Sequence, residues 1–198
     1  MGLAERRAKE KIERKKLIVG SAMKLIRSSE GVEGLTMRKL ADAIEYSPCV
    51  VYETFPNKES LIIDLFSSIC EELLEVMRSV PPADPEVYFR NLICKDVSFM
   101  MKEPYRVELF LIVSMETPPE EFPSAMQKVI ELIGNGLQGL GFSKLSTQEQ
   151  IEQAQDVLRT FLAGLLKLFV SQKSARGLDR CTCILEHGLN VLLNGWRI

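Results

Sequence analysis

The fold is decided by residues 34–61, which read GLTMRKLADAIEYSPCVVYETFPNKESL. Thr36 is a good N-cap for a first short helix, because its hydroxyl can accept from a free backbone N–H. Ser47 and Pro48 start a second short helix, since serine also caps well and proline loses no hydrogen bond at the first helical position. Pro56 ends this second helix. The stretch therefore predicts two short helices joined by a tight turn.

These two helices, 36–44 and 47–54, have the proportions of a helix-turn-helix. In that motif the first helix braces across the DNA backbone and the second lies in the major groove. The small core that fixes the angle between them is predicted to consist of Leu40, Ala41, Ile44 and Val51. Short helices of this kind also occur in ordinary helical domains, so the pattern alone leaves both interpretations open.

The residues themselves carry a resemblance to a known family. Residues 34–41, GLTMRKLA, resemble the segment that enters the helix-turn-helix of TetR-family bacterial transcription regulators. The match continues downstream at Ser47, Tyr52, Phe55, Asn57, Lys58, Glu59 and Leu61, and it extends upstream to Ile18, Ala22, Leu25 and Ile26. It covers about residues 12–65, and beyond them the chain is similar in length and helical layout only.

The resemblance implies an all-α fold with two domains. An N-terminal three-helix helix-turn-helix domain, residues 1–60, is expected to bind DNA, and a C-terminal helical bundle, residues 61–198, is expected to bind a ligand and to dimerise. The implied function is a ligand-responsive transcription regulator, a repressor released by a small, mostly apolar molecule. The alternative is a TetR-like helical dimer that acts as an interaction or sensing protein with weak or no specific DNA binding.

By the resemblance, Tyr52 and Lys58 contact phosphates, and Arg38 and Lys39 reach the DNA backbone or a neighbouring base. The predicted DNA-binding residues are Thr36, Arg38, Lys39, Ser47, Pro48, Cys49, Val50, Tyr52, Glu53 and Lys58. The positions that face the groove lack Arg, Asn and Gln, the usual bidentate readers of bases. We therefore expect contacts to the backbone of a palindromic double-stranded operator to supply most of the affinity.

Two positions depart from the family pattern. Glu45 and Cys49 stand where the family often has glycine, in the turn and early in the second helix. Glu45 is therefore expected to adopt a backbone conformation that glycine takes freely.

The charge is unevenly distributed along the chain. The net charge of the whole chain is −2, whereas residues 1–60 hold twelve Lys and Arg against nine Asp and Glu. Most of the positive excess lies in residues 6–16. A basic arm can neutralise phosphates without reading sequence. The alternative interpretation is a solvated helix start, because Glu5, Glu10 and Glu13 interleave with the cations.

Apolar residues recur at helical spacing through the rest of the chain and predict further helices. These are expected at about 57–77, 85–101, 104–117, 123–139, 147–170 and 178–193, the fifth opened by a capping box of Thr147 and Gln150. Adaptable and aromatic side chains are concentrated in 85–142, where they either line a ligand pocket or form plain core. The candidate ligand-binding residues are Phe89, Phe99, Met100, Tyr105, Arg106, Phe110, Met126 and Phe161.

The last two predicted helices are unusually apolar, with more such surface than one face of a monomer readily hides. By the resemblance they form a four-helix interface in a homodimer. The predicted interface residues are Phe161, Leu162, Leu165, Leu166, Phe169, Ile184, Leu185, Leu189 and Leu192. His187 lies in the same stretch and is interpreted as an interface histidine or one with its hydrogen bonds satisfied.

The remaining features weigh against other classes of protein. Five cysteines and one histidine offer no zinc or redox spacing, so no metal and no cofactor is expected. The chain has no catalytic motif such as a phosphate loop or HExxH, which argues against an enzyme. No apolar run reaches the roughly 18 residues of a membrane span, and the N-terminus does not resemble a signal peptide. We expect a cytoplasmic protein.

Overall fold

The computed structural model describes residues 2–28, 31–172 and 175–197. These residues contain helices and no strand. The helices are α1 (Leu3–Ser28), α2 (Met37–Ala43), α3 (Pro48–Thr54), α4 (Lys58–Arg78), α5 (Pro85–Met101), α6 (Pro104–Glu116), α7 (Ser124–Gly139), α8 (Gln148–Gln172) and α9 (Ala175–Arg197). Two short 3-10 helices, η1 (Pro119–Glu121) and η2 (Ser143–Leu145), lie in the connections. The prediction of an all-α chain is confirmed, and α9 extends beyond its predicted ends.

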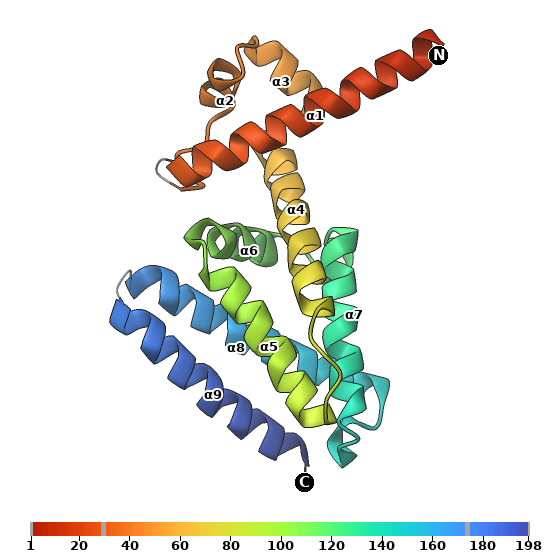
Figure 1. Ribbon diagram of the computed structural model, residues 1–198, viewed down its shortest axis with the longest axis vertical. Helices are drawn as coiled ribbons and strands as arrows, with labels where there is room; N and C mark the ends of the chain where they lie inside the picture. Colours follow the sequence, from red (N-terminus) through yellow and green to blue (C-terminus); the bar gives the residue numbers. More distant parts are fainter. Residues whose placement is uncertain (1, 29–30, 173–174, 198) are drawn as a thin grey trace. The chain divides into compact units, whose positions relative to one another are not determined.

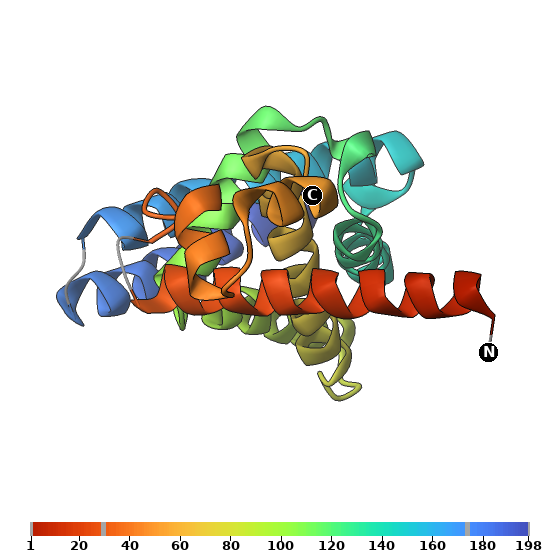
Figure 2. The same cartoon turned by 90° about the horizontal axis from the view of Figure 1, so that it is seen from above.

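The chain divides into two compact units, which we call the head (Met1–Phe66) and the body (Ser67–Ile198). α4 contributes residues to both units, because it begins at Lys58 and ends at Arg78. In the head, α2 and α3 lie on one side of the long helix α1, and the N-terminal turns of α1 run on past both (Figures 1 and 2).

Several helix starts follow from local sequence chemistry. The Asn57 side chain accepts from the backbone N–H of Ser60 at 2.8 Å and caps α4. The Thr147 hydroxyl accepts from Gln150 N at 3.2 Å, and the Gln150 side chain accepts from Thr147 N at 3.1 Å. This reciprocal pair confirms the predicted capping box at the start of α8.

The core of the head joins α1 to the two short helices. Ile18 and Ala22 of α1, Leu40 of α2 and Val51 of α3 are fully buried. Each large apolar side chain buried in this way contributes about 1.5–3 kcal/mol. These few residues therefore fix the mutual angles of α1, α2 and α3 and so the orientation of α3 within the head.

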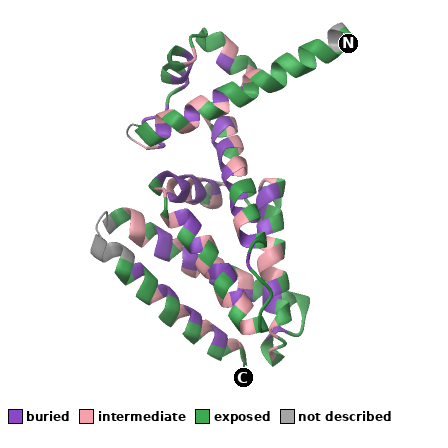
Figure 3. Cartoon of the chain, viewed as in Figure 1, coloured by how far each residue is buried: buried purple, intermediate pink, exposed green. Residues whose placement is uncertain are grey.

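The body is held by helices packed around α5 and α8. Phe89 of α5 is fully buried, and a Cβ added to Gly136 of α7 would lie 3.0 Å from its ring. Glycine at this position lets α7 approach α5 closely. α6 is buried or half-buried along most of its length, whereas residues 5–13 of α1 in the head are exposed (Figure 3).

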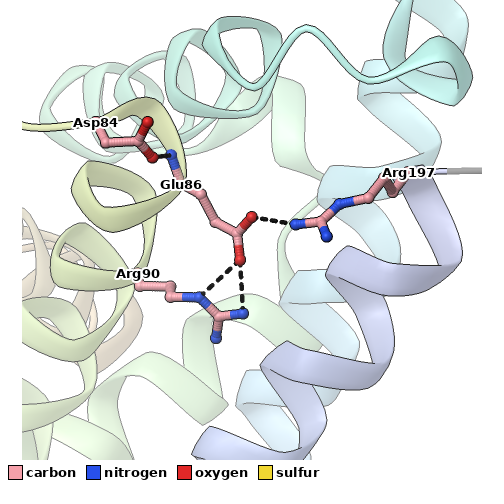
Figure 4. A network of polar contacts seen from close by, with 4 residues as sticks. All are labelled: Asp84, Glu86, Arg90 and Arg197. Atoms are coloured by element: carbon pink, nitrogen blue, oxygen red, sulfur yellow. Dashed lines mark hydrogen bonds and ion pairs between the residues drawn. The ribbon is translucent and has the colours of Figure 1, made fainter.

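A polar network ties the start of α5 to the end of α9 (Figure 4). The Asp84 carboxylate accepts from Glu86 N at 3.1 Å and caps α5. Glu86 accepts from the guanidinium of Arg90 at 2.9 Å and is also paired with Arg197. The hydrogen bond from Arg90 and the positive charge of Arg197 lower the pKa of the Glu86 carboxyl below its usual value.

Candidate DNA-binding interface and sensing body

The start of α2 is organised by Thr36. Its side chain accepts from the backbone N–H of Lys39 at 3.1 Å, so the predicted N-cap is confirmed. The Lys39 ammonium donates to the carbonyl oxygen of Gly34 at 3.1 Å. The threonine hydroxyl and the lysine are both at the surface, where they are accessible to a DNA backbone.

The turn between α2 and α3 places Glu45 in the left-handed region, with φ of 57°. The backbone N–H of Tyr46 then donates to the carbonyl of Ala41 at 3.1 Å. A non-glycine residue in this conformation costs about 1–2 kcal/mol. The expectation that Glu45 adopts a glycine-like backbone is confirmed, and the tight turn is kept despite the departure from the family pattern.

α3 exposes one side and buries the other. Val51 is fully buried, whereas Pro48, Cys49, Tyr52 and Glu53 are exposed. Residues at these spacings share one face of a helix. The face presents a ring, a thiol and a carboxylate to solvent, and it lacks a side chain that could donate two parallel hydrogen bonds to a base.

The N-cap of α3 differs from the prediction in one respect. Ser47 occupies the N-cap position and Pro48 the first turn, as expected. The serine hydroxyl, however, makes no capping hydrogen bond to the backbone. Proline at the first position has no N–H to satisfy, so fewer donors at this end require a cap.

The acidic residue on the exposed face of α3 is partnered from α1. The Arg14 guanidinium lies 3.5 Å from the Glu53 carboxylate, and the two side chains are 37% and 61% exposed. An exposed pair of this kind contributes little stability. Its consequence is electrostatic, because it offsets a negative charge on the side of α3 that would approach phosphates.

Lys58 and Phe55 connect α3 to α4. Phe55 is 3% exposed and belongs to the core of the head. The Lys58 ammonium donates to the carbonyl oxygen of Val32 at 3.2 Å and is partly buried. Lys58 therefore fastens the loop after α1 to the first turn of α4, a structural role that the sequence did not predict. Its predicted contact with phosphate stays a prediction.

In the body, Arg106 is the buried charged side chain among the described residues, at 8% exposure. Its guanidinium donates to the carbonyl oxygen of Phe99 at 2.8 Å and to the Glu72 carboxylate at 3.2 Å. It also lies 3.8 Å from the centre of the Phe99 ring. The Nε–H of Arg106 is buried without a hydrogen-bond partner. Such a donor costs about 1–3 kcal/mol while it is unsatisfied.

The other candidate ligand-binding residues are mostly interior. The buried ones are Phe89, Phe99, Met100, Tyr105, Phe110 and Met126. Phe161 is different, because its ring lies against Gly188 of α9, where an added Cβ would overlap it. A role in ligand binding stays a prediction for all of them.

Two features of the body were missed in the sequence. Asp96 of α5 is partly buried near the Cys70 thiol, and loss of hydration raises the pKa of this carboxyl to about 7. Cys70 in turn lies 3.9 Å from the sulfur of Met126. A polar groove of about 460 Å³ also runs between α7 and α8, and its lining includes Gln127, Glu131 and Gln155. A lone Asp in an amphipathic helix gives no sequence signal of burial, and the groove depends on how two helices pack.

The predicted dimer interface requires a correction. Five of its residues are buried within the single chain, at 5% exposure or less: Leu162, Leu165, Leu166, Leu185 and Leu189. These residues lie on the inner faces of α8 and α9, where they pack the two helices onto each other and onto the rest of the body. Phe161, Phe169, Ile184 and Leu192 remain partly exposed.

The outer side of the two helices carries an apolar stripe that the sequence prediction did not include in full. It comprises Val157, Phe161, Gly164 and Leu168 of α8 with Ile184, Gly188, Val191 and Gly195 of α9, which we call the α8–α9 stripe. Val157 and Val191 are 48% and 57% exposed. His187 lies beside this stripe and is exposed.

Comparison with known proteins is decisive for the head. Residues 18–65 match the family model described as bacterial regulatory proteins of the tetR family. The head is therefore similar to the N-terminal domain of this family. A comparison with curated protein sequences finds no match.

Solved structures support the TetR fold over the whole chain. A single-substitution variant of TetR from Acinetobacter baumannii AYE, in complex with minocycline, is 19% identical with a TM-score of 0.70, over 90% of this chain and 93% of that one. BioQ with its natural double-stranded DNA operator is 18% identical with a TM-score of 0.68, over 92% and 97%. A TetR transcriptional regulator from Rhodococcus sp. RHA1 is 15% identical with a TM-score of 0.68, over 93% and 97%. The expected TetR-like fold is confirmed.

No helix in the described ranges combines the length and the apolar character that a membrane crossing needs. Among those residues, no group of three or more His, Cys, Asp or Glu is arranged to hold a metal ion.

Proposed function

We propose that this TetR-family regulator works as a homodimer that binds a palindromic duplex operator through α2 and α3 and is released by a small, mostly apolar molecule. The observation that carries the proposal is the match of residues 18–65 to a helix-turn-helix whose second helix keeps one face exposed. The BioQ structure holds a DNA operator, and the fold is shared.

The DNA contacts are assigned by exposure and chemistry. Tyr52, 50% exposed on α3, donates its hydroxyl to a phosphate. Thr36, Arg38 and Lys39 contact the backbone from the start of α2, where all three are exposed. The thiol of Cys49 packs on a thymine methyl in the major groove. Affinity then depends mainly on backbone contacts.

The homodimer forms through the α8–α9 stripe. A twofold axis brings the same patch of both subunits together, so an exposed apolar stripe is covered by its own copy. Gly164 and Gly195, where an added Cβ would meet no atom of their own chain, allow the partner's helices to approach closely. Two recognition helices placed about 34–36 Å apart can read the two halves of a palindrome.

The effector binds within the body. Its pocket opens among the aromatic and methionine side chains around Arg106, and the unpartnered Nε–H of this arginine donates to an oxygen of the ligand. The minocycline complex of the Acinetobacter TetR variant is consistent with a small-molecule site in a body of this fold. Release requires that the effector bind the DNA-free state more tightly than the DNA-bound state.

The second candidate is an interaction or sensing protein with weak or no specific DNA binding. One observation favours it: the exposed face of α3 has no bidentate base reader, and its carboxylate at Glu53 is paired with Arg14.

Fluorescence anisotropy with the DNA that flanks the protein's own gene separates the two functions. The regulator is expected to bind a segment of this DNA at least about 10³-fold more tightly than an unrelated duplex of equal length. Equal affinity for both duplexes would exclude operator recognition in this DNA and favour the second candidate.

A further inference from the structure

The charged side chains of α1 that precede residue 18 differ in whether they form ion pairs. Arg6 pairs with Glu10 at 2.9 Å and Lys9 with Glu13 at 3.9 Å. The guanidinium of Arg7 is exposed and makes no ion pair or hydrogen bond within the described ranges. The same holds for the ammonium of Lys11, one turn later. An evenly solvated helix would mix both signs on every side.

Two unpaired cations, Arg7 and Lys11, share one side of α1, whereas a third, Lys16, lies about 140° from Lys11 around the helix. At 100° per residue, Arg7, Lys11, Arg14 and Ile18 fall within one arc of about 60°, and Glu10 lies about 40° beyond the edge of this arc. Ile18 is fully buried against the head, and Arg14 reaches Glu53 on α3. Arg7 and Lys11 therefore continue the side of α1 that faces α3.

Packing within the head does not explain why α1 extends N-terminal to residue 18. Figures 1 and 2 show them running past α2 and α3. Their apolar side chains, Ile12 and Leu17, are 56% and 45% exposed. These two residues lie about 140° apart around the helix, so they form no apolar face for a membrane surface.

We propose that the N-terminal turns of α1 form a second DNA-contacting surface, in which Arg7 and Lys11 hold backbone phosphates of the duplex that α3 enters. Resting on the proposed DNA binding, this surface lies outside residues 18–65 and adds affinity without sequence preference. The two residues are separated by about 6 Å along the helix axis. Duplex DNA carries one charge per about 1.7 Å of its axis, so both cations can be near phosphates at once.

The test compares two double variants of the full chain that lose the same charge. Arg7→Gln with Lys11→Gln removes the unpaired face, and Arg6→Gln with Lys9→Gln removes the paired face. The probe is a fluorescein-labelled duplex of about 30 base pairs with mixed sequence and no palindrome, titrated between about 50 and 200 mM salt. Circular dichroism checks that both variants keep the helix content of the wild type.

The slope of log K against log salt is expected to become shallower by about two in the Arg7/Lys11 variant. The Arg6/Lys9 variant is expected to keep the wild-type slope, and the charge-conserving Arg7→Lys with Lys11→Arg variant is expected to restore it. Equal slopes in the two glutamine variants, or tighter binding to a single strand of the same length, would overturn the proposal.

The outcome for this surface is distinguishable from that for the proposed function. A chain that prefers DNA flanking its own gene but shows equal slopes in the two glutamine variants supports the proposed function and contradicts the second DNA-contacting surface. A chain with the expected difference in slope but no preferred sequence supports the second DNA-contacting surface and contradicts the proposed function. A wild-type chain that binds neither duplex contradicts both.

Discussion

The head and the body place their predicted contact residues in opposite environments. In the head, Cys49, Tyr52 and Glu53 are exposed on one side of a helix whose other side is held by the fully buried Val51. In the body, Phe89, Met100 and their neighbours are interior. A DNA-reading face has to be open before DNA arrives, whereas an effector site can be closed until its ligand enters. Exposure is therefore a criterion for the proposed DNA contacts of the head and not for the proposed ligand contacts of the body.

The largest expected effect on stability comes from comparing a buried position with an exposed position of α9. Leu189→Glu places a carboxylate at a position that is 2% exposed, and it should cost about 4 kcal/mol or more and unfold the chain. Val191→Glu, at 57% exposure, should leave the fold intact and yield a monomer. Circular dichroism and sedimentation measure the two outcomes.

Val191→Glu alone tests the dimer, because its side chain lies on the α8–α9 stripe. Thr182→Glu, on an exposed part of the same helix, is the matched control and should remain dimeric. A wild-type chain that sediments as a monomer at micromolar concentration would remove the proposed interface.

The next effect concerns the exposed face of the head. Tyr52→Ala should weaken DNA binding about tenfold on all sequences alike, because a backbone contact carries no sequence information. Lys58→Ala should also reduce the salt slope by about one. Because Lys58 is bonded to Val32, this variant should lose about 0.5–1.5 kcal/mol of stability as well. Affinity and slope unchanged in both variants would remove these assignments.

A comparable effect is expected at the buried arginine. Arg106→Met removes the charge and the unpartnered donor but keeps much of the side-chain volume. If this donor anchors the effector, ligand affinity should fall while affinity for DNA without ligand is kept. With the wild type, saturating operator should weaken ligand binding by the same factor by which ligand weakens DNA binding, typically about 5- to 150-fold. An effector whose affinity is the same with and without operator would contradict the release mechanism.

The smallest expected effect is on the pH dependence of stability, to which two carboxyls contribute with opposite signs. The pKa of Asp96 is raised to about 7, so the folded chain keeps a proton that the unfolded chain loses, and stability falls as pH rises from about 4 to 7. Asp96→Asn should therefore raise the melting temperature by a few degrees at pH 8 and by less at pH 5. The lowered pKa of Glu86 gives stability above about pH 4.5 that is lost on acidification.

Melting curves of the Asp96→Asn and Glu86→Gln variants at pH 5 and 8 check both signs. Glu86→Gln should lower the melting temperature at pH 8. An Asp96→Asn variant that gains equally at both pH values would show that burial does not hold a proton on this carboxyl.

The sequence predicted the head more completely than the body. Thr36, Pro48 and Asn57 act through neighbours within a few residues, so these helix starts could be predicted locally, as could the capping box of Thr147 and Gln150 in the body. The unusual backbone of Glu45 followed from a glycine position in the family pattern.

Predictions about the body depended on which side of a helix meets another helix. Leu165 and Leu189 are apolar whether they face their own chain or a second copy, and sequence periodicity cannot distinguish these two cases. The same ambiguity hid the partly buried Asp96, because its surroundings include Cys70 of another helix, α4, and are not determined by its neighbours in α5 alone.

The contact between Phe161 and Gly188 constrains how this protein can change through evolution. A side chain cannot be added at position 188 while the ring occupies its place, so substitutions at the two positions are coupled. Relatives with a larger residue in place of Gly188 should carry a smaller one in place of Phe161, and relatives that keep the aromatic ring should keep the glycine. A lineage that crossed from one pair to the other would pass through either an overlap or a cavity on the outer side of α8 and α9, so the pair should be inherited together.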